Sequence, residues 1–502
     1  MVIEMTFLFK RTATLLLATM LAAPMVQAAP AKADVNALLK KFSERLEQLE
    51  KRNAELEQQL TQLRTENSAK LEPRIKAIEE QNAKIEKGLE NDGVSQYEPE
   101  LTARLKAVEY QSLNMQKSAR TVSALDGVTA GVSLTTVAQH PGEMPAGSHI
   151  HNSQLNYRGD VTVSLPLPNS GDIENKMVAA FRLGQGIGLN GVRSFAKPNA
   201  SAFRVSSTSP DDSVAVLGQA WYQATIPLPF GGFKPRSREK LEINFGKMDP
   251  FSFFDQNAVA NDETRQFLNT VFVHNPLLDA GGDIGVDANG FTPGFRVSYL
   301  NEVNKAEPWR LSFGVFGAGQ GANYTRFFSS PLVIAQVEKQ FKSFGGLNGN
   351  VRAYYWRNGQ AAQYSGDVAA HSGWGISADQ RVSDNVALFG RYGHQLTGRV
   401  SFDRALTFGA EFGGGLWQRG ADALGVSLGW LRTSNQFRND APTLADFGFA
   451  ASNAERVAEI YYRYRVNKQF ELSPDLQLIS RPAGNSDASL VKLFGVRAQI
   501  VY

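Results

Sequence analysis

The final ten residues of the chain, 493–502, alternate with a two-residue period and end on an aromatic side chain. The apolar face of the predicted strand carries Phe494, Val496, Ala498, Ile500 and Tyr502, and the other face carries Gly495, Arg497, Gln499 and Val501. One apolar and one wet face are what the wall of a membrane β-barrel requires, because lipid contacts one side and water the other. Lipid offers no hydrogen-bond partner to an open sheet edge, so such strands must close into a cylinder.

The same alternation recurs from residue 127 onwards, where glycine, aromatic and β-branched residues dominate short runs. Turns such as 383–385 and 466–468 separate neighbouring runs closely, and longer inserts such as 188–212 suit the loops of an opposite rim. At some 20 to 25 residues per strand and connection, this segment predicts an all-β transmembrane barrel of about 16 antiparallel strands, with about 18 as the alternative. A barrel of that size leaves an aqueous lumen.

A soluble β-sandwich or barrel would also alternate, so it is the competing interpretation of residues 127–502. Aromatic residues near the strand ends favour the membrane barrel, because they form girdles at the two interfaces. Arginines on the faces opposite the apolar ones favour it too, since a soluble core would reject them. The sequence therefore predicts a membrane barrel.

The N-terminal segment, residues 1–28, is typical of an export signal. Lys10 and Arg11 precede an apolar stretch over 12–25, and Val26-Gln27-Ala28 predicts cleavage after Ala28. A retained membrane anchor is the alternative, disfavoured by the short apolar stretch and by Pro24. Downstream, no run of about 18 apolar residues predicts a spanning helix.

Residues 33–120 are predicted to form a coiled-coil stalk and linker in the periplasm. Leucines and other apolar residues recur there at alternating spacings of three and four, and this 3.5-residue period gives a left-handed supercoil. Asn53 and Asn67 lie on the apolar seam, and Pro73 interrupts the helix. The alternative is a solvated helix that folds back on its own chain. A homotrimer is expected because large diffusion barrels commonly form trimers, although the seam does not choose between two and three strands.

Composition excludes several classes of function. A net charge of +3 over 502 residues is too small for a nucleic-acid-binding surface. The chain has no cysteine, and its six histidines are scattered, with His149 and His151 lacking a third ligand at a suitable spacing. We therefore expect no metal, no cofactor, no enzymatic activity and no nucleotide-driven transport.

Charged residues opposite the apolar faces are predicted to line the pore. They are Arg182, Glu242, Arg296, Arg310, Arg352, Asp379, Arg391, Glu411, Arg463 and Arg497. Such side chains orient water and hydrate polar solutes. The excess of arginine predicts a lumen that tolerates anions, and guanidinium planes beside aromatic rings suit sugars. For any single arginine, the alternative role is to stiffen the wall.

One segment, 249–272, breaks the alternation and predicts a loop that constricts the lumen. Asn261 is a plausible N-cap of a short helix, because Asp262 and Glu263 would follow in its first turn. The candidate constriction residues are Asp255, Asn257, Asn261, Asp262 and Glu263. A helix packed at the rim is the alternative.

Several motifs in this barrel segment resemble those of one family. They are Phe245-Gly246-Lys247-Met248-Asp249, Phe254-Asp255 with Asn257, Ala260-Asn261-Asp262-Glu263, Gln266-Phe267-Leu268-Asn269, Asp422-Ala423-Leu424-Gly425-Val426, Glu459-Ile460-Tyr461-Tyr462-Arg463-Tyr464, and Leu472-Ser473-Pro474-Asp475-Leu476-Gln477 with Pro482 and Gly484. From about residue 150 onwards the chain resembles the carbohydrate-selective porin (OprB-type) family. The resemblance implies a sixteen-stranded outer-membrane porin that passes sugars, although some relatives are assigned to inorganic ions. It implies no sugar-contacting residue, because the matching motifs lie at strand ends, turns and the insert.

The functional hypothesis is an outer-membrane porin that forms a passive diffusion channel for small hydrophilic solutes, carbohydrates foremost. Its expected partners are these solutes, outer-membrane lipid, two further copies of the chain and, through the stalk, peptidoglycan. One alternative is a structural tether between outer membrane and cell wall, and another is a porin for inorganic ions. A trimeric adhesin is disfavoured, because such proteins contribute few strands per chain.

Overall fold

The computed structural model describes the chain from residue 128 to its end, with gaps at 149–152, 190, 203–212, 231–236, 279–289, 319–327 and 453. The predicted signal peptide over 1–28 and the predicted coiled coil over 33–120 lie outside the described residues and stay predictions. No helix in the described ranges is both long and apolar enough to cross a membrane.

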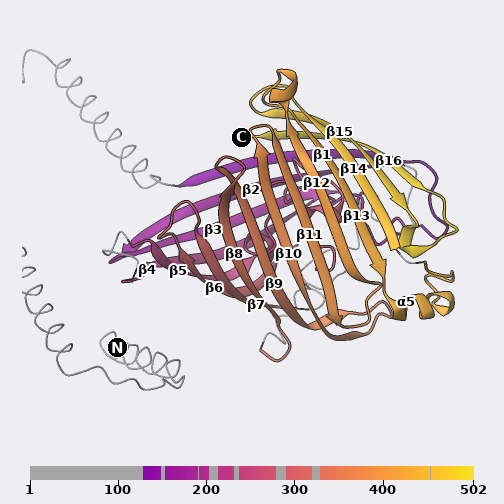
Figure 1. Ribbon diagram of the computed structural model, residues 1–502, viewed down its shortest axis with the longest axis horizontal. Helices are drawn as coiled ribbons and strands as arrows, with labels where there is room; N and C mark the ends of the chain where they lie inside the picture. The colour runs from indigo at the N-terminus through magenta and orange to yellow at the C-terminus, as the bar shows by residue number, and fades with distance from the viewer. Residues whose placement is uncertain are drawn as a thin grey trace, which may run out of the picture. The chain divides into compact units, whose positions relative to one another are not determined.

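Sixteen strands form one closed antiparallel barrel, as the sequence predicts (Figure 1). They are β1 (Thr129–Pro141), β2 (Gln154–Ser170), β3 (Ile173–Gln185), β4 (Val214–Pro227), β5 (Glu239–Met248), β6 (Thr292–Asn301), β7 (Trp309–Phe316), β8 (Leu332–Ser343), β9 (Leu347–Ala362), β10 (Val368–Ser383), β11 (Val386–Thr397), β12 (Phe402–Gly413), β13 (Ala423–Thr433), β14 (Ala454–Arg465), β15 (Phe470–Ser480) and β16 (Val491–Val501). Each strand pairs with its neighbours in the chain, and β1 pairs with β16 from Ser133 opposite Val501 to Pro141 opposite Leu493. No strand edge is left open, so every ladder can be satisfied within lipid.

Among the described residues, the helices are short and lie between strands. They are η1 (Pro250–Ser252), α4 (Thr270–Val273), η4 (Gly414–Trp417), α5 (Asn435–Asp440), η5 (Ala441–Thr443) and η6 (Pro482–Gly484). Of these, η1 and α4 belong to the connection between β5 and β6, which carries the candidate constriction residues.

The two rims of the barrel differ in the length of their connections. Tight turns join β8 to β9 and β10 to β11 at one rim, and in the first of these Gly345 and Gly346 supply the positive φ values of 79° and 99°. Long connections over 186–213 and 249–291 leave the other rim. Bacterial barrels keep short turns in the periplasm and long loops outside, so the end of β16 lies at the periplasmic rim (Figure 1).

The outer wall is apolar, with aromatic side chains near both strand ends. Phe494 is 55% exposed and Leu311 is 52% exposed, although both are paired on two sides within the sheet. Aromatic pairs lie near the periplasmic rim, Tyr299 with Trp309 and Trp417 with Tyr462, and near the outer rim, Trp374 with Tyr392. Exposed apolar side chains between two aromatic levels match a lipid-facing wall.

A turn at the periplasmic rim, residues 414–422, is held by a carboxylate. Asp422 accepts hydrogen bonds from Arg419 Nε at 2.5 Å, Tyr462 Oη at 2.6 Å and the Arg465 N–H at 2.9 Å. Burial by itself would raise the pKa of Asp422, but these hydrogen bonds outweigh it and lower the pKa to about 2. The ionised carboxylate is therefore the form that stabilises the fold.

We expect the contribution of Asp422 to stability to disappear in acid. Its pKa falls from about 3.9 in the unfolded chain to about 2 in the fold, so the stabilisation is complete above about pH 4 and is lost as the pH falls through about 2. In detergent, the unfolding temperature of the protein should exceed that of Asp422→Asn at pH 7, and the gap should narrow between about pH 4 and pH 2. Asp487→Asn, in an exposed loop, is the control. A gap that stays constant with pH would contradict the assignment.

Candidate functional site in the barrel lumen

The connection between β5 and β6 folds into the lumen. Its described N-terminal part, residues 249–278, is called the insert below. Asp249 caps η1 by accepting a hydrogen bond from the Phe251 N–H, and Asn269 caps α4 by accepting one from the Val271 N–H. The large side chains of the insert are buried in one cluster with residues of the barrel wall. The insert therefore fills part of the lumen instead of packing on the rim.

The helix expected from Asn261 is wrong, and the helix begins at Thr270 instead. The Asp262 carboxylate accepts from the Thr264 N–H at 2.9 Å, and the Gln266 side chain accepts from the N–H groups of residues 261 and 262, so the chain makes a single turn. The next N–H groups, of Leu268 and Asn269, donate to a carboxylate on β14 at 2.6 and 3.0 Å. They are not available to continue a helix.

Asp255 joins the insert to the wall through a fully buried ion pair. Its carboxylate accepts hydrogen bonds from the Asn275 N–H, Tyr354 Oη and Arg391 Nε at 2.5, 2.8 and 3.2 Å. The side chains of Asp255 and Arg391 are both 0% exposed. Asp255 also has a φ of 54°, a left-handed conformation that aspartate tolerates better than most residues. The structure thus places one predicted constriction residue, Asp255, and one predicted pore residue, Arg391, at an anchor.

Other candidate constriction residues also contact the wall. Asn257 donates to Ser377 Oγ at 3.2 Å and to the Ala378 carbonyl at 3.0 Å, and Glu263 pairs with Arg158 at 2.7 Å. Arg497 donates to the carbonyl oxygens of residues 263 and 266 at 2.9 and 2.7 Å. Asn261 and Asp262 lie in the turn between these contacts and are half-buried. The insert is therefore held from several sides of the barrel.

A second inward segment is the described part of the β3–β4 loop, residues 186–202 without 190. Glu455 on β14 accepts hydrogen bonds from Ser194 Oγ, the Phe195 N–H and the Ala196 N–H at 2.8 to 2.9 Å. It also accepts one from the Ala483 N–H at 2.6 Å. One buried carboxylate thus binds both the β3–β4 loop and the β15–β16 connection at the outer rim.

The remaining predicted lumen arginines are paired with carboxylates. Arg182 pairs with Asp160, Arg296 and Arg310 with Glu242, Arg352 with Glu338 and Asp379, and Arg463 with Glu411 and Glu471. Each of these arginines therefore has a negative partner among the described residues, and the predicted tolerance of the lumen for anions stays a prediction. Asp160, Glu338 and Glu471 are not among the predicted residues, although Glu338 shares the inward parity of its strand with Gln336 and Gln340.

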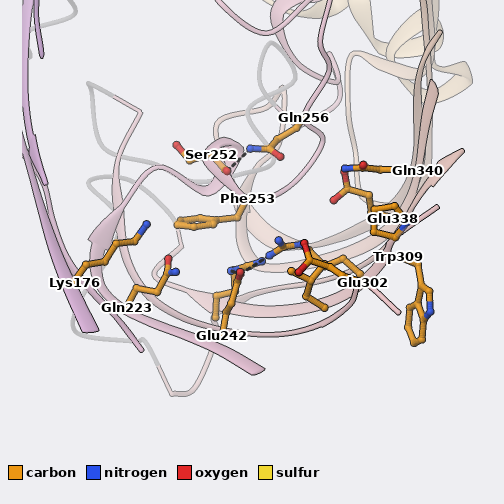
Figure 2. Close-up of a pocket in the computed structure, with 14 residues that line it drawn as sticks. Lys176, Gln223, Glu242, Ser252, Phe253, Gln256, Glu302, Trp309, Glu338 and Gln340 are labelled. Carbon is orange, nitrogen blue, oxygen red and sulfur yellow. Dashed lines mark hydrogen bonds and ion pairs between the residues drawn. The ribbon is translucent and has the colours of Figure 1, made fainter. Parts of the chain in front are cut away.

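A polar cavity of about 380 Å³ lies between the insert and the wall formed by β3–β8. Its lining includes three predicted pore residues, Glu242, Arg296 and Arg310, with Lys176, Gln223, Ser252, Phe253, Gln256, Leu300, Glu302, Pro308, Trp309, Glu338 and Gln340. Figure 2 shows Lys176, Gln223 and Glu242 reaching from the wall towards Phe253 of the insert. We call this space the luminal cavity. The other seven predicted pore residues do not line it.

Charged groups lie close to aromatic rings at and beside the luminal cavity. The Arg296 guanidinium carbon lies 4.8 Å from the centroid of the Phe253 ring. The ring of Trp221 lies 5.5 Å from that of Phe253, and Lys176 Nζ lies 5.8 Å from the Trp221 ring. The arrangement offers donors, acceptors and a ring face to a small polar molecule.

The sequence and the fold of this chain are both similar to those of known proteins. The model of the carbohydrate-selective porin, OprB family, matches residues 185–502. The high-pH structure of Pseudomonas putida OprB is similar to this chain with a TM-score of 0.58 at 16% sequence identity, over 76% of this chain and 96% of that one. The low-pH structure of the same protein gives a TM-score of 0.43 at 16% identity, over 77% and 96%.

A curated relative is also matched, over a short stretch. It is an uncharacterised protein of Aquifex aeolicus (strain VF5), 33% identical over 76 residues, which are 15% of this chain. The chain spans about a fifth, 21%, of that protein's length. The family model covers most of the barrel, and the barrel itself has the fold of a solved porin. The chain therefore belongs to the carbohydrate-selective porin, OprB family, and is an outer-membrane porin.

Proposed function

We propose that the protein is a passive diffusion channel for small uncharged hydrophilic solutes, carbohydrates foremost, and that the luminal cavity is where the solute is selected. The observation that carries the proposal is the balanced lining of this cavity. Three basic side chains, Lys176, Arg296 and Arg310, face three acidic ones, Glu242, Glu302 and Glu338. Three glutamines and the ring of Phe253 complete the wall.

This lining suits a polyol better than an inorganic ion. Sugar hydroxyls both donate and accept hydrogen bonds, so they can contact guanidinium groups, carboxylates and amides at once. The apolar C–H face of a sugar can pack on the ring of Phe253, which Arg296 already contacts from one side. With equal numbers of positive and negative groups, the cavity has no strong preference for either sign of ion.

Planar-bilayer recordings test the proposal. Added oligosaccharides should reduce single-channel conductance by occupying the luminal cavity, while the salt current should show weak ion selectivity. A channel with strong ion selectivity and no block by any oligosaccharide would instead be a porin for inorganic ions. Family membership and the barrel would stand in either case.

We expect Phe253→Ala to weaken oligosaccharide block. Removing the ring removes a packing surface worth about 1.4 kcal/mol, so the blocking constant should rise about tenfold. Salt conductance should change little, because the anchors of the insert are intact. Phe230→Ala, in the β4–β5 connection where the side chain is 78% exposed, is the matched control. An unchanged blocking constant in Phe253→Ala would remove Phe253 from the solute path.

We also propose the domain arrangement that the sequence predicts: a signal peptide over 1–28, a periplasmic stalk over 33–120 and the barrel domain over 127–502. The stalk would hold three copies together and contact peptidoglycan. Deletion of residues 33–91 tests it, with oligomeric state and envelope integrity as readouts. Damage to the envelope with unchanged conductance would make the tether the stalk's main role.

A further inference from the structure

Basic side chains gather on the outer wall of the barrel, near the outer ends of β9–β16. Five of them, called the basic row below, are Arg357, Arg404, Arg432, Arg456 and Lys492. Strand register places three of them close together: Arg404 lies directly opposite Arg432, and Arg456 lies opposite Trp430, two residues from Arg432. The row continues to Arg357 on β9, opposite Ser372, and to Lys492 on β16, opposite Leu478. The connection that carries α5 joins the outer ends of β13 and β14, away from the periplasmic rim (Figure 1).

The basic row points away from the lumen. Ala405, Leu431 and Leu493, next to its members in the chain, are buried on the inner face. Arg357, Arg456 and Lys492 are exposed, and Arg404 and Arg432 are half-exposed. Because side chains alternate along a strand, the row shares its face with the lipid-facing wall.

The row has few negative partners. Asp403 contacts Arg432, with 3.4 Å between Oδ2 and Nη1. Among the residues that the structure describes, Arg357, Arg404, Arg456 and Lys492 form no ion pair, and Nε of Arg404 is buried without a hydrogen-bond partner. Arg404 and Arg432 lie directly opposite each other, and like charges in such positions destabilise a sheet. The row therefore carries a cost that an external anion would remove.

Its level on the wall indicates where that anion lies. Trp374, Tyr392 and Trp430 are on the same face, at or just inside the level of the row, where an aromatic girdle meets the headgroups. At the periplasmic ends of the same strands, the outward positions carry Tyr462, Tyr464 and other apolar or aromatic residues. Basic charge is thus concentrated on one side of the membrane, and mainly on one half of the barrel.

We propose that the basic row binds the phosphorylated headgroup of a glycolipid in the outer leaflet. Adjacent strands are about 4.8 Å apart, so Arg404, Arg432 and Arg456 on three successive strands cover about 10 Å, the scale of a headgroup with two phosphates. Guanidinium groups bind phosphate through paired hydrogen bonds, and the acyl chains would lie on the apolar wall below. A basic cluster beside the membrane-spanning wall is favoured by anionic lipid at the interface.

Binding of diphosphorylated lipid A to the full-length protein in detergent tests the proposal. The fully dephosphorylated glycolipid is the comparison ligand, and native mass spectrometry is the readout. We expect the phosphorylated form to bind about tenfold more tightly or better, and we expect R404Q/R432Q/R456Q to lose this preference. The control K305Q/K339Q/K468Q removes three cations near the periplasmic rim, two of them in exposed turns, and should keep it.

Further experiments distinguish a lipid headgroup from free phosphate, and a lipid-binding face from a subunit interface. Inorganic phosphate at the same concentration should not displace the lipid, and displacement would show a free-phosphate site instead. Equal lipid binding by R404Q/R432Q/R456Q would overturn the proposal. So would dissociation of an oligomer in that variant with its lipid preference intact, since the face would then be a subunit interface. Unchanged single-channel conductance, expected here, shows that the variant is folded and leaves the proposed solute selectivity untouched.

Discussion

Asp255→Asn should release the insert from the barrel wall and raise single-channel conductance several-fold. Asparagine has nearly the same shape as aspartate. It also tolerates the φ of 54° that the backbone adopts at this position. It leaves the buried Arg391 guanidinium without its negative partner, although backbone carbonyls of residues 255 and 272 still accept from it. Breaking a buried ion pair by removing one member costs about 3–5 kcal/mol. The insert can avoid that cost by moving away and letting water reach Arg391.

Conductance and thermal unfolding in detergent measure this outcome together. Asp487→Asn, an exposed loop carboxylate, should leave both unchanged. Adding Arg391→Met to Asp255→Asn removes the unpaired charge, so the double variant should unfold at a higher temperature than Asp255→Asn alone. An Asp255→Asn channel with normal conductance and stability would show that the other contacts hold the insert without this ion pair.

Glu455→Ala should free the β3–β4 loop and destabilise the outer half of the barrel by about 3 kcal/mol or more, since each buried donor left without an acceptor costs about 1–3 kcal/mol. Four donors lose their acceptor in this variant: Ser194 Oγ and the N–H groups of Phe195, Ala196 and Ala483. Glu455→Gln keeps one acceptor oxygen and nearly the same volume, so its loss should be smaller.

Limited proteolysis of the β3–β4 loop and the unfolding temperature give the readouts for Glu455. Faster cleavage within residues 186–202 is expected in Glu455→Ala, with Glu455→Gln between it and the unchanged protein. Glu143→Ala, in the exposed connection between β1 and β2, controls for the loss of a carboxylate. Cleavage at the same rate in all four proteins would mean that the loop is fixed by packing alone.

The wall of the barrel could be predicted because lipid imposes a pattern on the sequence. In β16, Phe494 and Ile500 face lipid while Arg497 faces the lumen, as the two-residue period requires. The pattern fades in β8, where Leu332 and Ile334 are apolar yet point inwards and pack against the insert. Wherever the lumen is filled by protein, both faces of a strand are apolar and alternation no longer tells them apart.

The candidate site was less predictable, because its contacts join residues that are far apart in the chain. Parity places Arg310 and Arg352 in the lumen, but only the register of β7, β8 and β9 shows that Glu338 lies opposite both. The local signals at Asn261 favour a helix, and Glu459 on β14 overrides them by taking the N–H groups of residues 268 and 269. Tertiary hydrogen bonds of this kind leave no local trace in the sequence.

The pairing of β1 with β16 has a consequence for biogenesis. The strands β1 and β16 come from opposite ends of the barrel domain, so their pairing carries the largest loop-closure entropy among the described strand pairs. Until β16 pairs with its two neighbours, β1 and β15 each have an unpaired edge that can bind strands from other chains. The nascent polypeptide must therefore be kept from premature pairing while it travels to the membrane. The barrel closes only when β16 pairs with β1.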